Sequence, residues 1–585
     1  MKFRYDHVGK GQKDDMHKTV TVLGICDGHE AGAAIVRDGK VVAAVLEERL
    51  RNEKHWGGVP SLSLHEVFKI ASIDPSEIDL ISLGNIDRVW VPGREYPLKV
   101  RLFHKLPSFM ITRTFVRTYV RILKGFRKMK ELLSILGDLG LEGTEITTLH
   151  HQTVHAAAAY RSAPWPYNEK VLVFTCDGSG DGLSATVSIG EKARLTRVAE
   201  TSYYDSVGTA FYSEITAYLG LKRWDNEYKT MGLAPYGRPE QCLAEMRKIV
   251  RLNPSNPLQF ENTIGAYLPG DIQKKLRRIL SGKRFDDIAA ASQAWLEQLL
   301  TTWVDTAAEE YSIRKIACAG GVFLNVKANQ RILESCKIDD AFFCPVAGDD
   351  GQALGAALEG YYQFCEREGL DPIKQPLQDL YLGPSYDESL VEKALSSSGW
   401  LQKAEKHGNI DGVVGEHLAK GGIVARFAGR LETGPRALGN RSILADARDL
   451  KVIRRINFAI KHRDFWMPFA PTILEDRIKD YLVNPRSAPY MILSFHTTNN
   501  RDDIVAGIHP FDLTCRPQTL NPAWNEGYAS VLREFEKITG AGGILNTSFN
   551  LHGYPIVGTP EHALWTLEQS DLDYLAIGDY LVKKH

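Results

Sequence analysis

The sequence predicts an α/β protein with at least two domains, and two observations support this. A chain of 585 residues is longer than one hydrophobic core usually serves, so two or more domains are expected. A unit consisting of a buried strand, the letters CDG and two further strands joined by a tight turn occurs near residue 21 and again near residue 171. This repetition indicates a duplicated architecture.

Each copy of the unit can be followed along the chain. The first strand is predicted to begin near Thr19 and to end in "GICDG", and the hairpin "AGAAIVRDGKVVAAVLEER" follows with an Asp-Gly turn. The second copy reads "VLVFTCDGSGDG" and then "LSATVSIGEKARLTRVAET". This plan is similar to the actin and sugar-kinase type of ATPase, in which two like subdomains face a nucleotide cleft. Glycines there let the backbone approach phosphates.

Two more glycine-rich loops follow predicted strands, in "IACAGGVFLNVKANQRI" and "FCPVAGDDGQALGAAL". One such loop is usually only a turn, but four in corresponding places favour a nucleotide cleft. Between them, "FDDIAAASQAWLEQLLTTWVDTAAEEY" has the apolar spacing of a helix. Pro372 and Pro376, with polar neighbours, mark a boundary near residue 380. We therefore expect domains at 17–379 and 380–585.

The amino-acid composition limits the classes of function that this protein can have. The chain is 44% hydrophobic and 24% charged with a formal net charge of -1, so it lacks the overall basic field of a nucleic-acid binder. The N-terminus mixes Lys and Asp, and no window approaches about 18 apolar residues, which predicts a cytoplasmic protein. The eight cysteines form no CxxC pair and are expected to be buried reduced thiols. Residues 94–130 contain eleven Lys or Arg, which suit a solvated helical face, a membrane surface, an acidic partner or nucleic acid.

A candidate metal site begins in "HHQTVHAAAAY". In a helix His151 and His155 share one face, with His150 off it, although such a pair alone is more often part of a buried helix. Asp177, in "CDGSGDG", and Asp349, in "AGDDG", are each expected to end a strand. Two imidazoles and two carboxylates suit Fe(II), Mn(II) or Zn(II).

Seven motifs carry a resemblance to a known family. They are "GICDGHEAGAAIVRDGKVVAAVLEERLRNEKH", "HHQTVHAAAAY", "EYKTMGLAPYG", "PVAGDDGQALGAAL", "GRLETGPRALGNRSILADAR", "IKHRDFWMPFAPTIL" and "GGILNTSFNLHGYPIVGTPEHAL". In this order, and from residue 22 to the last residue, the chain resembles the NodU and CmcH carbamoyltransferases. The resemblance implies an ASKHA-type domain, similar to TsaD, fused to a YrdC-like α/β domain.

The resemblance also implies the reaction and its cofactors. Carbamoyl phosphate and ATP give a carbamoyl-adenylate in the second domain, and the first domain passes the carbamoyl group to an acceptor hydroxyl. By this likeness His151, His155, Asp177 and Asp349 surround an iron-type ion, most readily Fe(II). His29, in "DGHEAG", is the candidate acid–base group, since imidazole titrates near neutrality, although a histidine there can simply cap a turn. The family usually has Asp where this chain has Glu30.

Further candidates follow from the matched motifs, each with an ordinary loop role as the alternative. The nucleotide is expected at Glu227, Lys229, Gly320, Gly321 and Asn325, and the acceptor near Lys54 and His55. In the second domain Arg and Lys suit phosphate oxygens, and carbamoyl phosphate is expected at Arg436, Lys461, Arg516, Asn546 and Ser548. Arg463 belongs to the same cationic set, whereas Arg430 and Arg441 have acidic neighbours such as Glu432 as alternative partners. Pro517 departs from the family's usual Arg-Val-Gln.

The leading hypothesis is an ATP-dependent O-carbamoyltransferase that acts on a hydroxyl of a small molecule, such as a secondary metabolite in antibiotic biosynthesis or a saccharide, without nucleic acid as a partner. A tRNA threonylcarbamoylation enzyme and a non-catalytic nucleotide-binding scaffold are the alternatives. The acceptor, the metal's identity and the oligomeric state, for which a homodimer is one option, stay open.

Overall fold

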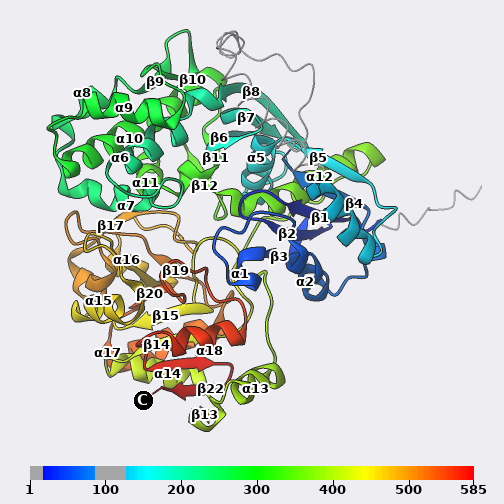
Figure 1. Cartoon of the computed structure of the whole chain (residues 1–585), viewed down its shortest axis with the longest axis vertical. Coiled ribbons are helices and arrows are strands. Elements are labelled where there is room, and N and C mark those ends of the chain that lie inside the picture. Colours follow the sequence, from blue (N-terminus) through cyan, green and yellow to red (C-terminus); the bar gives the residue numbers. More distant parts are fainter. Residues whose placement is uncertain (1–17, 86–126, 585) are drawn as a thin grey trace, which may run out of the picture.

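The structure, a computed structural model, describes residues 18–85 and 127–584. The chain forms an upper part made of two lobes and a lower part around a larger sheet (Figure 1). No helix within the described ranges is both long and apolar enough to cross a membrane. Of the basic segment 94–130, only residues 127–130 are described, so the expectations for the rest lie outside the described residues.

The first lobe is built on a five-stranded sheet of order β3-β2-β1-β4-β5. Its strands are β1 (Thr21–Cys26), β2 (Gly32–Arg37), β3 (Lys40–Leu46), β4 (Leu80–Gly84) and β5 (Ile146–Leu149). Strands β1 to β3 are antiparallel, while β4 and β5 run parallel to β1. The predicted Asp-Gly turn is confirmed, since Asp38 and Gly39 join β2 to β3 with φ of 48° and 75°. Helices α1 (Glu47–Arg51) and α2 (Ser61–Ala71) follow.

The second lobe repeats this order as β8-β7-β6-β11-β12. Its strands are β6 (Val171–Gly180), β7 (Leu183–Glu191), β8 (Arg194–Ser202), β11 (Lys315–Ala319) and β12 (Asp340–Phe343). Again three strands are antiparallel and two are parallel to the first. The same order and the same strand directions in both lobes confirm the duplicated actin-type architecture.

The two lobes exchange a helix. Helix α5 (His151–Ser162) follows the last strand of the first sheet but packs on β6, β7 and β11 of the second sheet. Helix α12 (Gln352–Glu368) follows the last strand of the second sheet and packs on β1, β2 and β4 of the first. The two helices also pack against each other. Alanines and glycines allow this close approach, because a Cβ on Gly355 of α12 would meet the Val154 carbonyl oxygen of α5 at 2.3 Å.

The second lobe also carries six α-helices within the described ranges. They are α6 (Ser213–Tyr218), α7 (Glu227–Leu233), α8 (Leu243–Met246), α9 (Pro269–Ile279), α10 (Phe285–Tyr311) and α11 (Val326–Ser335), with a small hairpin of β9 (Val250–Asn253) and β10 (Asn256–Asn262). The helix predicted from "FDDIAAAS" is α10, the longest helix within the described ranges.

Residues 369–387 contain no helix or strand and lead into the lower domain, so the expected boundary near 380 falls within this connection. The lower sheet has the order β13-β22-β21-β14-β15-β20-β16-β19 and mixes parallel and antiparallel pairs. Its strands are β13 (Ala404–Lys406), β14 (Ile423–Phe427), β15 (Arg441–Ala445), β16 (Ala470–Leu474), β19 (Gln518–Leu520), β20 (Gly543–Ser548), β21 (Tyr574–Ile577) and β22 (Tyr580–Lys583). The predicted fold class, α/β with a duplicated actin-type domain joined to a second α/β domain, is confirmed.

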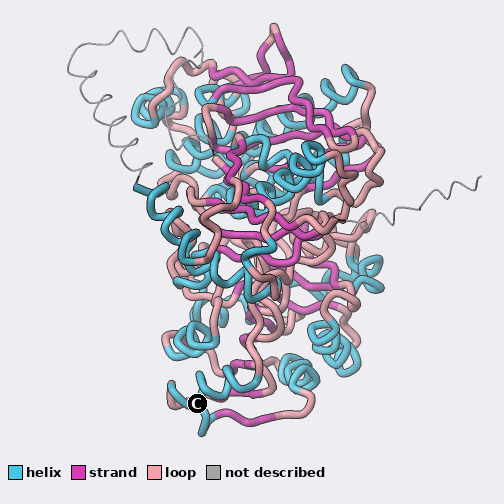
Figure 2. Tube along the Cα trace, turned by 90° about the vertical axis from the view of Figure 1, so that its right-hand side faces the viewer, coloured by secondary structure: helices cyan, strands magenta, loops and turns pink. Residues whose placement is uncertain are grey.

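Helices α14 (Ile410–Ala419) and α17 (Glu526–Thr539) pack together and enclose one apolar core of the lower sheet. The others are α13 (Glu388–Ser397), α15 (Lys451–Ile456), α16 (Ile478–Tyr481) and α18 (Pro560–Glu568), with a short hairpin of β17 (Phe495–His496) and β18 (Thr514–Cys515). In the perpendicular view, strands extend from the top of the molecule to its lower end, with helices between and beside them (Figure 2).

Polar contacts hold the lower domain against both lobes. Arg49 donates to the Gly434 carbonyl oxygen at 2.8 Å, and Lys229 pairs with Asp464 at 2.9 Å. His509 bonds to the Gly232 carbonyl oxygen at 2.9 Å. Loops of the two domains therefore face each other across a close interface, and several predicted site residues lie in these loops.

Candidate active site and metal centre

The four predicted metal ligands meet where the carboxyl ends of the two sheets converge. His151 and His155 lie in the first two turns of α5, and both are buried. Asp177 does not end a strand as expected, because β6 continues to Gly180 and Asp177 lies at a break in its pairing with β7. Asp349 does not end a strand as expected, because β12 stops at Phe343 and Asp349 opens the short 3₁₀ turn η7 (Asp349–Gly351) that leads into α12.

The ligand atoms of this cluster face one another. The Nε2 atoms of His151 and His155 are 3.1 Å apart. Asp177 Oδ2 lies 3.3 and 3.9 Å from them, and Asp349 Oδ1 lies 3.4 and 3.5 Å from them. A tetrahedral cation about 2.1 Å from each of four such atoms would separate them by about 3.4 Å. The donor set and its spacing therefore fit a first-row divalent ion.

Neighbouring groups fix the orientation of these ligands. His151 Nδ1 lies 3.1 Å from the Asn85 side-chain oxygen, which can only accept a hydrogen bond, so Nδ1 carries the proton and Nε2 faces the cluster. The backbone N–H of His151 donates to Asp181 Oδ2 at 2.7 Å. The Gly321 N–H donates to Asp177 Oδ1 at 2.9 Å, which leaves Oδ2 for the cluster.

The imidazoles and carboxylates of the cluster shift one another's pKa values. Burial lowers the pKa of His151, but the carboxylates of Asp349 and Asp177 outweigh burial and raise the pKa to about 10. The pKa of the Asp349 carboxyl lies well below its ordinary value, because the attraction of His151 and His155 exceeds the desolvation that opposes it. Two adjacent carboxylates thus hold positive charge in a buried place, as a cation site requires.

A second group of side chains borders the first lobe. His29 is exposed and its ring stacks on that of His55, with centroids 5.3 Å apart. His55 lies between two carboxylates, 3.1 Å from Glu30 and 3.1 Å from Asp225. Lys54 also contacts Asp225, at 2.7 Å. His29, Glu30 and His55 present ligand-type atoms within 4.8 Å of one another, separately from the four-ligand cluster.

The residues expected at the nucleotide are already engaged in several contacts. Gly320 and Gly321 follow β11 beside Asp177, and a Cβ on Gly320, at φ +98°, would meet the Cys176 carbonyl oxygen at 2.3 Å. Asn325 caps α11 and donates to Gln293, and Glu227 accepts from the Trp224 N–H at 2.7 Å. Lys229 is ion-paired with Asp464. The structure therefore brings the two glycines to the cluster, while Asn325, Glu227 and Lys229 have local partners.

The lower domain gathers cations without counterions. Arg436, Arg463 and Arg516 lie in loops, and Lys461 is the last residue of a short π-helix, η9 (Asn457–Lys461). None of the four forms an ion pair with a carboxylate of the described residues. Burial lowers the pKa of Arg516 well below its ordinary value, and repulsion from Arg436 and Arg463 adds to the effect. Burial and Arg463 act in the same way on the pKa of Lys461. Such a cluster is arranged to receive an anion.

Strand β20 carries Ser548, which contacts the cation cluster, and Asn546, which lies two residues before it. Lys461 donates to Ser548 at 3.0 Å and to the Asn550 side chain at 2.7 Å. Asn546, which pairs with Leu444 and Ala470 of the flanking strands, is buried and donates to the Thr472 hydroxyl at 3.1 Å. Its side-chain oxygen accepts no hydrogen bond from the described residues.

Two cations named with this set lie elsewhere. Arg441 is fully buried, donates to the carbonyl oxygens of Ala428 and Asn440, and stacks on Phe427 at 3.7 Å. Arg430 donates to backbone carbonyl oxygens of Leu382 and Val42. Neither forms the expected ion pair with Glu432, whose carboxylate instead accepts from backbone N–H groups of the following loop. Both arginines thus hold the loop that carries Arg436.

Three residues of these sites are missing from the sequence expectations. Asn85 directly follows β4, whose last residue pairs with the last residue of β5, so its place beside His151 follows from the parallel register. Asp225 lies in the α6–α7 loop and gives no sequence signal. Asn550, two residues after Ser548, extends the matched "NTSFN" motif.

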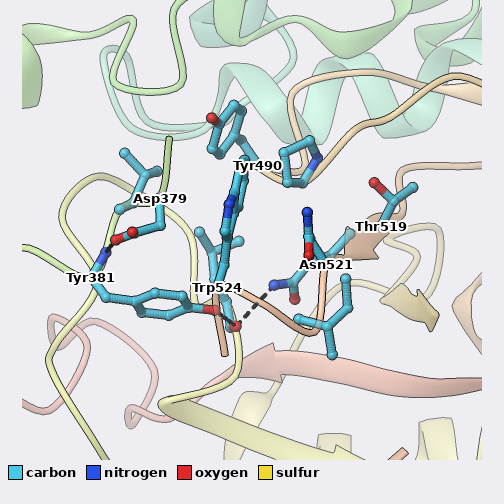
Figure 3. A pocket seen from close by; sticks show the side chains of 11 residues that line it. Asp379, Tyr381, Tyr490, Thr519, Asn521 and Trp524 are labelled. Carbon is cyan, nitrogen blue, oxygen red and sulfur yellow. Dashed lines mark hydrogen bonds between the residues drawn. The ribbon is translucent and has the colours of Figure 1, made fainter. Parts of the chain in front are cut away.

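A separate small pocket lies beside the connection to the lower domain, lined by Asp379, Tyr381, Tyr490, Asn521 and Trp524 among others (Figure 3). The Tyr381 hydroxyl and the Gln518 amide both donate to the Leu438 carbonyl oxygen, at 2.8 and 2.9 Å. None of the predicted site residues lines this pocket, and its hydrogen bonds anchor the connection.

The fold and the two clusters define a class of protein: an actin-type α/β domain with a candidate metal centre, joined to an α/β domain with a buried anion site. Comparison with family models gives the family. The model described as Carbamoyltransferase N-terminus matches residues 21–358, and the model described as Carbamoyltransferase C-terminus matches residues 415–584. The chain therefore belongs to the carbamoyltransferase family, as the resemblance predicted, and this membership supports carbamoyl transfer as its reaction.

Relatives span most of the chain. An uncharacterized protein of Synechocystis sp. is 30% identical, with 95% of each chain covered. Nodulation protein NolNO of Sinorhizobium fredii is 31% identical, over 95% of this chain and 79% of that protein. Among solved structures, HypF of T. kodakarensis matches 60% of this chain and 48% of its own, with 12% identity and a TM-score of 0.34.

Proposed function

We propose that the protein is an ATP-dependent O-carbamoyltransferase that uses carbamoyl phosphate and acts on a hydroxyl of a small molecule, such as a secondary metabolite or a saccharide. Water first cleaves carbamoyl phosphate to carbamate and phosphate. A carbamate oxygen then attacks the α-phosphorus of ATP, pyrophosphate leaves, and carbamoyl-adenylate forms. The acceptor oxygen finally attacks the carbamoyl carbon, AMP leaves, and the hydroxyl proton passes to a base.

The observation that carries this proposal is the cation cluster of the lower domain. Four cationic side chains lie close together without a carboxylate partner among the described residues, although desolvation disfavours each charge. Such an arrangement is stabilised by a multiply charged anion. Arg436, Arg463 and Arg516 supply planar forks for phosphate oxygens, and Lys461 supplies a point charge beside Ser548.

The upper domain supplies the second half of the proposal. His151, His155, Asp177 and Asp349 would hold the divalent ion, for which Fe(II) is our candidate. When bound, such an ion supplies a Lewis acid that polarises a carbonyl and stabilises the developing oxyanion. His29, exposed and stacked on His55, is the group we assign to accept the proton of the acceptor hydroxyl. Glycines 320 and 321 allow the nucleotide to approach beside Asp177.

The test is product analysis. Protein purified without chelators is incubated with ATP, carbamoyl phosphate and a panel of alcohols and sugars, and AMP, pyrophosphate and carbamoylated acceptors are measured by chromatography and mass spectrometry. We expect AMP in amounts equal to the carbamoylated acceptor, with no product when any one substrate is left out.

Matched variants separate the two sites. Arg516→Gln should reduce formation of pyrophosphate by about 100-fold, whereas His29→Gln should leave formation of pyrophosphate intact and slow only the transfer to the acceptor. An exposed arginine far from both clusters, Arg278→Gln, is the control. If no hydroxylated acceptor gains a carbamoyl group while the folded wild type retains its metal, the proposed function is wrong.

A further inference from the structure

His55 occupies a place between two carboxylates that come from different lobes. Its Nδ1 faces Glu30 Oε1 and its Nε2 faces Asp225 Oδ1, each at 3.1 Å. Glu30 belongs to the turn between β1 and β2 of the first lobe, whereas Asp225 belongs to the α6–α7 loop of the second. The first lobe's Lys54 also reaches Asp225, at 2.7 Å, so two cations of one lobe share a carboxylate of the other.

This geometry keeps His55 positively charged. Hydrogen bonds to Asp225 and Glu30 outweigh burial and the neighbouring Lys54, and they raise the pKa of His55 to about 9. The same contact with His55 lowers the pKa of Asp225 far below its ordinary value. At neutral pH the group is therefore an imidazolium between two carboxylates. Because both ring nitrogens are engaged as donors, His55 is not available as a metal ligand in this arrangement.

Glu30 and His55 have strained backbone conformations, and Glu30 connects this group of side chains to the metal centre. Glu30 and His55 adopt φ of 55° and 57°, a left-handed conformation that costs free energy for residues other than glycine and persists where surrounding contacts enforce it. The second oxygen of Glu30 accepts the Asp350 N–H at 2.9 Å, and Asp350 directly follows Asp349. A continuous chain of contacts thus runs from Asp225 to the loop that carries a metal-site carboxylate.

We propose that Asp225, His55 and Glu30 form an inter-lobe clasp that positions His29, so that the acid–base group is held in place only when the second lobe supplies Asp225. Within the described residues the His29 side chain forms no hydrogen bond or ion pair, and its ring stacks on that of His55. The His55 ring is held at both nitrogens and is therefore a rigid surface for this stacking. Without Asp225, the His55 ring would be held at only one nitrogen and would be free to turn. Asp225 and His55 are accordingly positioning residues. This inference rests on the proposed function.

The groups that face His55 are known from the structure. They are His29 and Glu30 of the β1–β2 turn, Glu48 of α1, which accepts the His55 N–H at 2.8 Å, Lys54 of the same loop, and Asp225. Lys222 touches only the other oxygen of Asp225, at 3.1 Å. Lys222→Gln therefore removes one contact of Asp225 but keeps the contacts of Asp225 with His55 and Lys54, which makes it the matched control.

The first test is kinetic. Asp225→Asn removes the charge but keeps the size of the side chain, and we expect kcat for carbamoyl transfer to fall about tenfold or more, with little change in KM for ATP or carbamoyl phosphate. Asp225→Glu should restore part of kcat, and Lys222→Gln should match the wild type. If Asp225→Asn and Lys222→Gln are equally active, the clasp does not position His29 and the proposal is overturned.

The second test needs no activity. Selective ¹⁵N labelling of the histidines, with His55→Gln used for assignment, gives the titration midpoint of His55 by NMR. We expect a midpoint near 9 in the wild type, lowered by at least about one pH unit in Asp225→Asn. A wild-type midpoint near 6.5, or one that Asp225→Asn leaves unchanged, overturns the proposal. If the wild type transfers no carbamoyl group, the proposed function fails, while this midpoint still decides whether the clasp exists.

Discussion

Replacing Gly180 with alanine should disable the metal centre without removing any ligand. Gly180 is the last residue of β6, and a Cβ built there would lie 2.1 Å from Cγ and 2.2 Å from Cδ2 of His151. Ordinary contacts begin near 3.4 Å, so the imidazole must retreat by about 1.3 Å. Metal–ligand distances tolerate only about 0.2 Å, and the shift also breaks the hydrogen bond to Asn85.

We therefore expect Gly180→Ala to lower the affinity for Fe(II) by at least about 100-fold, equivalent to about 2.7 kcal/mol. The assay is anaerobic titration of metal-free protein with Fe(II), or with Mn(II) followed by electron paramagnetic resonance, with thermal unfolding to show that the variant is folded. Gly143→Ala is the control, because no atom lies within 4 Å of its added Cβ. A folded Gly180→Ala protein that binds metal within about threefold of the wild type would refute the reasoning.

Three further predictions follow from the same contacts. Asn85→Ala should lower metal affinity by about 10- to 100-fold in the same titration, because Asn85 sets which nitrogen of His151 carries the proton; unchanged affinity would contradict this role. Arg516→Gln should reduce AMP formation by about 100-fold while metal content by mass spectrometry stays at the wild-type level, and a loss of metal would show that the two clusters are not independent. The clasp should stabilise the fold fully below the ordinary pKa of His55, near 6.5, and lose this effect as pH rises through about 9, since the folded-state pKa is raised. The difference in melting temperature between wild type and Asp225→Asn should accordingly shrink above pH 9, and a difference that grows there would contradict the assignment.

Patterns in the sequence predicted those elements of the structure that depend on residues close together in the chain. The Asp38-Gly39 turn and the helix that carries His151 and His155 lie where the sequence places them, since turn conformation and helical spacing are local properties. The two-lobed plan followed from seeing one strand unit twice. Asp349 was misplaced onto a strand because an apolar run followed by glycine does not reveal where pairing stops.

Contacts between distant segments of the chain could not be predicted from the sequence. Asp225 lies in a loop with the composition of an ordinary polar turn. Only the packing of one lobe against the other brings it to His55. Arg441 illustrates the opposite error, because a cation in a glycine-rich motif suggests phosphate although its partners are backbone carbonyl oxygens. Charge alone cannot separate a ligand-binding arginine from one that secures a loop.

The exchange of α5 and α12 between the lobes has a consequence for assembly of the protein. In the upper domain each sheet is covered by a helix that follows the last strand of the other sheet, so neither sheet can bury the apolar face under that helix without the other half. Three of the four metal-site residues, His151, His155 and Asp349, lie at or just before the starts of these same two helices. Binding of the ion therefore depends on completion of the fold. If the polypeptide were cut between the two halves, each fragment would have to bind the helix supplied by the other before the metal centre could form.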